Sequence, residues 1–242
     1  MYEFDLGAGV RTTTIGSELM DIHRTRAAVA EPVVRAEVAR LGEAPASAID
    51  LACSEGWFAH RLLDWGVGMV EAIDIRPENT RRATLVRDRL GIDADSLRLR
   101  TADVFELDPA ALGTFDVVLC LGLIYHLENP VGALRIARAL TRGVCIVESQ
   151  LTEQVQPIRH GSGQTGQFLE QDGSWAAYLE PPQLQEGYAI ASYGGVLSLI
   201  PNRAALLQAM SVAGFSRVEA LVPRTGNPQY VDGHRLVVAG WP

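Results

Sequence analysis

Three aspartates stand at the ends of successive apolar runs, where their side chains could bind a ligand: Asp50, Asp74 and Asp103. The first opens a loop of small residues, DLACSEG, which leads into a predicted helix at Trp57. Small side chains let a loop backbone approach a ligand closely, and an acid at the end of the next strand accepts hydrogen bonds from ribose hydroxyls. The pattern therefore predicts a nucleoside-binding site at one edge of a sheet.

The loop differs from dinucleotide-binding loops, because Ala52 and Ser54 stand where those loops carry glycine and no G-x-G-x-x-G is present. Each aspartate also has a plainer interpretation: Asp50 could cap a helix or orient the loop, Asp74 could be a surface acid, and Asp103 could begin a turn. Position favours ribose binding for Asp74 and adenine binding for Asp103, and leaves ligand contact and loop orientation equally open for Asp50.

A second group of polar residues follows the fourth and fifth apolar runs. The fourth run ends in CLGLIYHLENP, which brings Tyr125 and His126 to the same edge. Imidazole titrates near neutral pH, so His126 is a candidate general base. A histidine that hydrogen-bonds the backbone and shapes the loop is an equally good interpretation, and Tyr125 could line the pocket or simply pack. Glu148 and Gln150 end the fifth run and could bind polar groups of a substrate.

Alternating strand and helix patterns must position these residues. The predicted strands are 46–51, 68–75, 97–101, 115–121 and 144–148, and the predicted helices are 57–65, 77–90 and 130–140. Such alternation is typical of an α/β fold with a mostly parallel sheet covered by helices on both faces. Open sheets of this kind bind ligands at the carboxyl ends of their strands, so the polar residues should share one crevice.

Two segments outside this alternation are predicted to cover the crevice. The spacing of apolar residues over 17–41 predicts one or two amphipathic helices, broken or kinked near Pro32, as part of an N-terminal helical lid over 1–45. Residues 151–201 lose the alternation and gain Gly, Gln, Pro and aromatic residues, which predicts a substrate cap inserted after the fifth strand.

The remaining residues complete the predicted core, which spans 46–150 and 202–242. A helix at 202–213 precedes strands at 215–222 and 234–239. Their connection is too short for a crossover helix, which predicts an antiparallel pair that closes the sheet.

The composition indicates one soluble globular domain of 242 residues with a formal charge of −8. Every cation is arginine, which excludes mechanisms that need a Schiff-base lysine or a P-loop lysine. The acidic balance argues against a nucleic-acid partner. Three dispersed cysteines, the lack of a secretory signal and the lack of a long apolar span indicate a cytoplasmic protein without a membrane partner. No residues have metal-ligand spacing, so we expect no metal site.

On these motifs the sequence resembles the class I S-adenosylmethionine-dependent methyltransferases over nearly the whole chain. DLACSEG is similar to their glycine-rich first motif, and the closing antiparallel pair is similar to their final hairpin. The segments FDLGAGVRT, LGLIYHLENP and SLIPNRAALLQAMSVAGF are similar to the branch that contains the tRNA wobble-uridine alkyl-transferases and many small-molecule methyltransferases. Those tRNA enzymes use basic surfaces and a lysine for their carboxylated cofactor, whereas this chain is acidic and has no lysine.

The resemblance implies a Rossmann-like methyltransferase sheet with S-adenosylmethionine as cofactor and S-adenosylhomocysteine as product. It implies that Asp74 holds the ribose, that Asp103 with Val104 holds the adenine, and that the backbone near Ala52 and Leu121 holds the methionine end. The expected cofactor-binding residues are Asp50, Ala52, Cys53, Ser54, Gly56, Trp57, Asp74, Ile75, Asp103, Val104 and Leu121.

The expected reaction is methyl transfer to an O, N or C nucleophile of a small aromatic or heterocyclic molecule. Such a transfer is an in-line displacement, so a base such as His126 is needed only where the nucleophile must lose a proton, and Tyr125 is the other catalytic candidate. The expected substrate-binding residues are Glu148, Gln150, Trp175, Tyr178, Tyr188 and Tyr193, although the cap aromatics could equally be packing residues.

Two other functions fit the same sequence: a tRNA-modifying methyltransferase, and a non-catalytic nucleoside-binding relative of the fold. Residues 1–41 and 151–201 are candidates for a lid, a homodimer interface or both.

Overall fold

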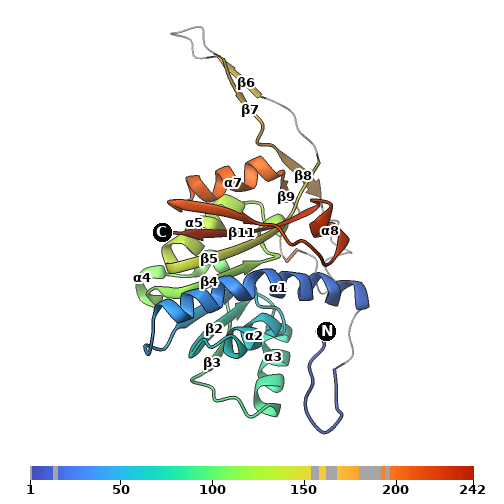
Figure 1. Ribbon diagram of the computed structural model, residues 1–242, viewed down its shortest axis with the longest axis vertical. Helices are drawn as coiled ribbons and strands as arrows, with labels where there is room; N and C mark the ends of the chain where they lie inside the picture. Colours follow the sequence, from blue (N-terminus) through green and yellow to red (C-terminus); the bar gives the residue numbers. More distant parts are fainter. Residues whose placement is uncertain (1, 13–15, 154–157, 162–167, 180–191, 194–196) are drawn as a thin grey trace.

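The computed structural model describes residues 2–12, 16–153, 158–161, 168–179, 192–193 and 197–242. Within these residues the chain folds around a seven-stranded sheet in the order β10-β11-β5-β4-β1-β2-β3 (Figure 1). The strands are β1 (Ser47–Leu51), β2 (Met69–Asp74), β3 (Leu97–Thr101), β4 (Phe115–Leu121), β5 (Thr141–Gln150), β10 (Arg217–Leu221) and β11 (Arg235–Trp241). Strands β1 to β5 pair in parallel, and β11 runs antiparallel to both β5 and β10.

Helices cover both faces of this sheet, and each face has its own apolar core. On one face lie α1 (Ser17–Arg40), α2 (Trp57–Asp64) and α3 (Pro77–Arg89). On the other lie α4 (Pro109–Leu112), α5 (Pro130–Leu140) and α7 (Arg203–Val212). Successive side chains of a strand point to opposite faces, so in β4 Val117 and Leu119 join the first core while Val118 and Cys120 join the second.

Short elements surround the carboxyl edge of the sheet. They are the 3₁₀ turns η1 (Val104–Glu106) and η2 (Ile124–His126), the helical turn α8 (Pro228–Val231), and the hairpin of β8 (Trp175–Leu179) with β9 (Leu197–Pro201). Strand β9 packs against η2, where Leu199 N donates to the carbonyl of Leu127 at 3.3 Å. A second hairpin, β6 (Ile158–Gly161) with β7 (Phe168–Gln171), projects away from the body of the fold (Figure 1).

The predicted sheet, with parallel strands and an antiparallel last strand, is confirmed, and the predicted helices between the strands are present. Two expectations about boundaries were wrong. Helix α1 runs unbroken through Pro32, because packing across β4, β5 and β11 holds the helix despite the hydrogen bond that proline removes. Strand β5 begins at Thr141, three residues earlier than its apolar run, because pairing with β4 extends the strand.

The segment predicted as the cap contains regular structure. Within 151–201, which the sequence predicted to lack alternation, the structure describes two antiparallel hairpins. The division into lid, core and cap stays a prediction. No described helix has the length and apolar character to cross a bilayer, and no described group of three or more His, Cys, Asp or Glu side chains is arranged to hold a metal ion.

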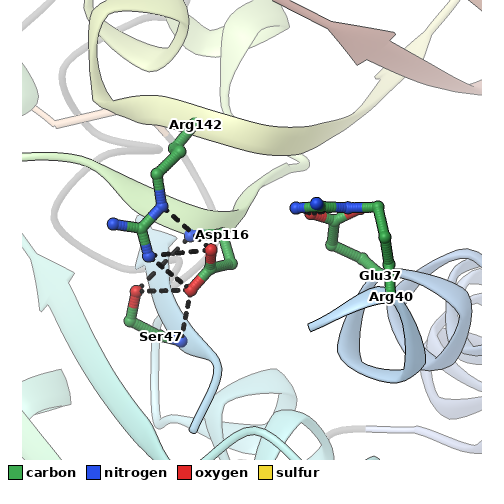
Figure 2. A network of polar contacts seen from close by, with 5 residues as sticks. All are labelled: Glu37, Arg40, Ser47, Asp116 and Arg142. Atoms are coloured by element: carbon green, nitrogen blue, oxygen red, sulfur yellow. Dashed lines mark hydrogen bonds and ion pairs between the residues drawn. The ribbon is translucent and has the colours of Figure 1, made fainter. Parts of the chain in front are cut away.

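A buried carboxylate ties three neighbouring strands together at the amino edge of the sheet, opposite the crevice (Figure 2). Asp116 of β4 accepts hydrogen bonds from the backbone N and the hydroxyl of Ser47 in β1, at 2.9 and 3.0 Å, and an ion pair from Arg142 of β5 at 2.8 Å. Burial alone would raise the pKa of Asp116, but the hydrogen bonds from Ser47 and Arg142 outweigh it and hold the pKa below its ordinary value of 3.8.

We expect Asp116→Asn to lower the free energy of unfolding by about 2 kcal/mol at pH 7, since it breaks charged hydrogen bonds in a buried position. Because the folded-state pKa is depressed, the carboxylate stabilises the fold above pH 3.8 and this contribution is lost as pH falls through the lower folded value. Urea unfolding of both proteins at several pH values measures the difference. Asp95, which forms an exposed ion pair with Arg98, provides the control, and Asp95→Asn should change stability little. An equal loss of stability in both variants would contradict the stabilising role of Asp116.

Candidate active site

A cavity of about 990 Å³ opens at the carboxyl edge of the sheet. Its walls come from the loops after β1, β2, β3 and β4, from the first turns of α1, and from Tyr178, Ser192 and Tyr193 of the predicted cap. The volume lies at the upper end of the range for small-molecule sites, so the cavity has room for a nucleoside-containing ligand and a second small molecule.

The loop after β1 has a strained backbone on the cavity wall. Ala52 and Ser54 have φ values of +61° and +51°, in the left-handed region that favours glycine, and Gly56 has +80°. A side chain at Gly56 would also press on α3, because its Cβ would lie 3.3 Å from the Cβ of Ala83. The loop therefore keeps the backbone path of a glycine-rich loop although two of its positions carry other residues.

Asp74 at the end of β2 holds this loop in place. Its Oδ2 accepts a hydrogen bond from Ser54 N at 2.8 Å, and its Oδ1 accepts from Arg76 N at 2.9 Å and from Asn79 Nδ2 at 3.0 Å. Burial raises the pKa of Asp74, while these donors act in the opposite direction. The carboxylate lines the cavity and has acceptor capacity left for a ligand, since two oxygens offer about four lone-pair positions.

Asp50 lies behind the same loop and does not line the cavity. It is 2% exposed, and its Oδ2 has no hydrogen-bond partner among the described residues. Burial, followed by the nearby charge of Asp74, raises the pKa of Asp50 to about 8, although the backbone N–H of Ala59 lowers it. At neutral pH Asp50 is therefore largely protonated and acts on the loop as a neutral group.

The residues after β3 form the next part of the wall. Asp103 accepts a hydrogen bond from Phe105 N at 2.9 Å and so caps η1. Val104 is buried beside it, and Phe105 lies 42% exposed on the cavity surface. Asp103 thus begins a turn, as one interpretation predicted, and it also lines the cavity, as the other required.

The residues after β4 line the other part of the cavity. Leu121 and Gly122 lead into η2, where the rings of Tyr125 and His126 lie 4.4 Å apart. His126 Nδ1 lies 3.4 Å from the hydroxyl of Ser192 in the cap, within hydrogen-bonding range. His126 therefore faces the cavity and also contacts the cap, so both of its interpretations stay open.

A buried ionic cluster lies behind and beside this wall. Glu148 is fully buried and forms ion pairs with Arg26 of α1 at 2.8 Å and with Arg235 of β11 at 3.0 Å. The hydroxyl of Tyr230 donates to the same carboxylate at 2.8 Å. Burial lowers the pKa of His23, which contacts Arg26, to about 2, so this histidine adds no charge.

Arg76 links residues 192 and 193 to the end of β2. Its guanidinium lies 5.0 Å from the ring centre of Tyr193 and donates to the carbonyl of Ser192 at 3.3 Å. This contact draws residues 192 and 193 of the cap towards the end of β2.

The structure brings most of the predicted site residues to one cavity. Its walls include Ala52, Ser54, Asp74, Ile75, Asp103, Val104, Leu121, Tyr125, His126, Gln150, Tyr178 and Tyr193. Predicted residues that lie away from the cavity surface are Asp50, Cys53, Gly56, Trp57, Glu148 and Trp175, and Tyr188 lies outside the described residues. Cys53, Gly56 and Trp57 support the loop and the start of α2, and Trp175 packs against the core on the α5 and α7 side.

Among the wall residues that sequence reasoning missed are Tyr2, His23, Arg26 and Arg235. The pattern of α1 gave no sign of which polar residues would face inward. Arg235 had a usable signal, because it lies in the strand predicted at 234–239, which in the structure pairs with the end of β5.

The chain matches a protein family described as "Methyltransferase domain" over residues 22–220. Among curated relatives, the ubiquinone biosynthesis O-methyltransferase of Xanthomonas axonopodis pv. citri is 30% identical over 104 residues, 43% of this chain and 42% of that protein. The tRNA U34 carboxymethyltransferase of Saccharophagus degradans is 26% identical over 130 residues, 53% of this chain and 37% of that protein. The chain thus spans about two fifths of the length of these relatives.

Solved structures match over more of the chain. The N-terminal domain of EvdMO1, crystallised in the presence of S-adenosylhomocysteine (SAH) and D-fucose, superposes with a TM-score of 0.65 and 25% identity, covering 99% of this chain and 89% of that one. The same domain with SAH bound gives 0.61 and 27%, covering 87% and 80%. The 1,6-didemethyltoxoflavin-N1-methyltransferase of Burkholderia thailandensis shares the fold at 17% identity, with a TM-score of 0.53 and coverage of 99% and 98%.

The strained loop predicts that glycine would stabilise it. We expect Ala52→Gly to raise the free energy of unfolding by about 1 kcal/mol, since it relieves a left-handed backbone at a residue with a Cβ. Ala48→Gly in buried strand β1 is the matched control and should destabilise. Urea unfolding at pH 7 measures the free energy of unfolding of both variants. Destabilisation by Ala52→Gly would contradict the claim that the backbone at Ala52 is strained.

The raised pKa of Asp50 predicts a pH dependence of stability. Between pH 3.8 and about 8 the folded chain keeps this carboxyl protonated while the unfolded chain ionises it, so its contribution is greatest at low pH and is lost as pH rises. The stability of Asp50→Asn relative to the original chain should therefore increase from pH 5 to pH 8. A pH-independent difference in urea unfolding would show that Asp50 ionises normally.

Proposed function

The chain belongs to the methyltransferase-domain family, as its sequence indicated, and on that premise we propose that it transfers a methyl group from S-adenosylmethionine to a small molecule. When bound, this cofactor would supply an electrophilic methyl group on a sulfonium.

The observation that carries this proposal is the hydrogen bond from Ser54 N to Asp74 Oδ2. It fixes a backbone loop and a carboxylate side by side in one cavity wall, and that pairing can bind a nucleoside through close backbone approach and ribose hydroxyl donors. Asp103 and Val104 continue the wall and would hold the adenine, while the backbone near Ala52 and Leu121 would hold the methionine end.

The residues present fit such a ligand. The loop exposes backbone rather than bulky side chains at Ala52 and Ser54, and the cavity has room beyond a nucleoside. After β4, Gly122 leaves space beside Arg26, because a Cβ there would lie 3.1 Å from the guanidinium of Arg26. Methyl transfer depends mainly on alignment of the acceptor with the methyl group, which two ligands held side by side in one cavity would supply.

The acceptor would lie beside η2 and the cap. Tyr125 and His126 face this part of the cavity, with Gln150, Tyr178 and Tyr193 around it. His126 would accept a proton only from an acceptor that must lose one. EvdMO1 was crystallised with SAH and D-fucose, which supports a small molecule as acceptor. A homodimer and a cytoplasmic location stay predictions from the sequence.

Similarity to a tRNA U34 carboxymethyltransferase supports a second candidate, a nucleic-acid substrate. The net charge of −8 and the absence of lysine weigh against it, because binding to phosphates depends on basic surface. A gel-shift experiment with tRNA at low ionic strength decides between a small-molecule substrate and a tRNA substrate. Salt-sensitive binding would favour the tRNA substrate.

Calorimetric titration with SAH tests the main proposal, with NAD as the control ligand. We expect micromolar binding of SAH and none of NAD. Asp74→Asn should weaken SAH binding by about tenfold or more, since a carboxylate acceptor for the ribose hydroxyls is lost. Asp116→Asn, an equally buried aspartate at the opposite edge of the sheet, should leave the affinity unchanged.

A deoxyribose analogue of SAH separates ribose binding from support of the loop. The original chain should prefer SAH over its 2′-deoxy or 3′-deoxy analogue, and Asp74→Asn should lose that preference. Full preference in the variant would mean that Asp74 acts only through Ser54. Absence of SAH binding in folded protein would overturn the proposed function.

A further inference from the structure

Two buried arginines lie in the cavity wall next to η2. Arg26 and Arg235 both line the cavity and are 5% and 8% exposed. Among the described residues their shared anionic partner is the single carboxylate of Glu148, which lies behind the wall. His23 is adjacent and neutral, since burial holds its pKa at about 2. The cluster therefore has a net charge of about +1, and a buried unbalanced charge is costly unless an anion completes it.

The guanidinium groups of Arg26 and Arg235 differ in how many of their nitrogens have a partner. All three nitrogens of Arg26 have partners: Tyr230, His23 and Glu148. Arg235 donates from Nε to Gln229 at 2.6 Å and from Nη1 to Glu148 at 3.0 Å, while no described residue accepts a hydrogen bond from its Nη2. The unused donors therefore belong to Arg235.

The surroundings of Arg235 are polar and belong to the acceptor end of the cavity. Gln229 and Gln150 line the cavity beside it, Gln150 being its register partner across β11 and β5. The hydroxyl of Tyr125 lies 3.4 Å from Arg235 Nη1. Asp74 and Asp103 follow β2 and β3, on the other side of β1 from β5 and β11 in the sheet order. The carboxylates of Asp74 and Asp103 and the guanidinium of Arg235 thus lie in different parts of the cavity.

We propose that Arg235 binds an anionic oxygen group of the methyl acceptor, a carboxylate in the simplest case, with Gln150 and Gln229 as its neutral neighbours. The N–H groups of Arg235 Nη2 suit a carboxylate oxygen, because a hydrogen bond between two charged groups is stronger than one between neutral groups. This inference rests on the proposed function for the identity of the acceptor. It narrows the substrate class to small organic acids.

Benzoate and its neutral isostere benzamide are the probes, titrated at constant ionic strength into protein saturated with SAH and followed by ligand-observed NMR. We expect benzoate to bind in the millimolar range and benzamide to bind at least about tenfold more weakly. Arg235→Gln should abolish this preference and leave SAH affinity unchanged. Arg217→Gln, an exposed arginine on β10, is the control and should behave like the original chain.

A second variant should change the benzoate affinity in the opposite direction, which separates anion binding from structural support of the cluster. Glu148→Gln removes the only described anion of the cluster, so benzoate should bind more tightly and raise the thermal unfolding midpoint more than in the original chain. A purely structural role for the cluster would weaken benzoate binding in both variants.

The same titrations name the outcomes that overturn the inference. Equal binding of benzoate and benzamide, no binding of either, or retained preference in Arg235→Gln would each exclude an anion site at Arg235. If Arg235→Gln instead weakens SAH but not 5′-methylthioadenosine, which lacks the amino-acid part, the arginine serves the cofactor carboxylate and the acceptor assignment is wrong. Failure of SAH to bind the original chain would refute the proposed function separately, and the benzoate titration repeated without SAH would still test the anion site.

Discussion

The carboxylate of Asp74 is the point on which the cavity depends. It accepts hydrogen bonds from the loop after β1 through Ser54, from its own strand end through Arg76, and from α3 through Asn79. The loop after β1 and the turn from β2 into α3 are thereby held at fixed positions around one buried acid. The left-handed backbone of the β1 loop persists because these bonds, together with the bond from Cys53 N to the carbonyl of Ile73 at 2.7 Å, outweigh its strain.

The two edges of the sheet use buried charge differently. At the amino edge Asp116 is matched by Ser47 and Arg142, and the match stabilises the fold (Figure 2). At the carboxyl edge Asp50 keeps an oxygen without a described partner, and Arg235 keeps donors that no described residue uses. Proteins satisfy buried polar groups wherever stability alone decides, so incomplete pairing of groups around a cavity is typical of a binding site.

The cover over the cavity is tied to the core by specific contacts rather than by apolar packing alone. Arg76 links Ser192 and Tyr193 to the end of β2, and His126 lies within hydrogen-bonding range of Ser192. Helix α1 contributes Arg26 to the ionic cluster and packs across the sheet. The segments predicted as lid and cap therefore share side-chain contacts with the binding surface, and opening either of them would break polar contacts that also shape the cavity.

The sequence by itself determined the order of strands and helices, the antiparallel closing pair and the acids at the strand ends, because these depend on short-range periodicity and on where each strand stops. Pro77 and Gly91 bound a helix for local backbone reasons, so its limits could be predicted to within a residue or two. Tertiary structure alone decided that Glu148 lies behind the wall, since its position depends on Arg26, which is 122 residues away in sequence (148 minus 26). It also decided that Pro32 stays within a helix and that residues near 175 and 200 pair as a hairpin. Burial and long-range pairing set these outcomes, and no local pattern encodes which distant partner a side chain will find.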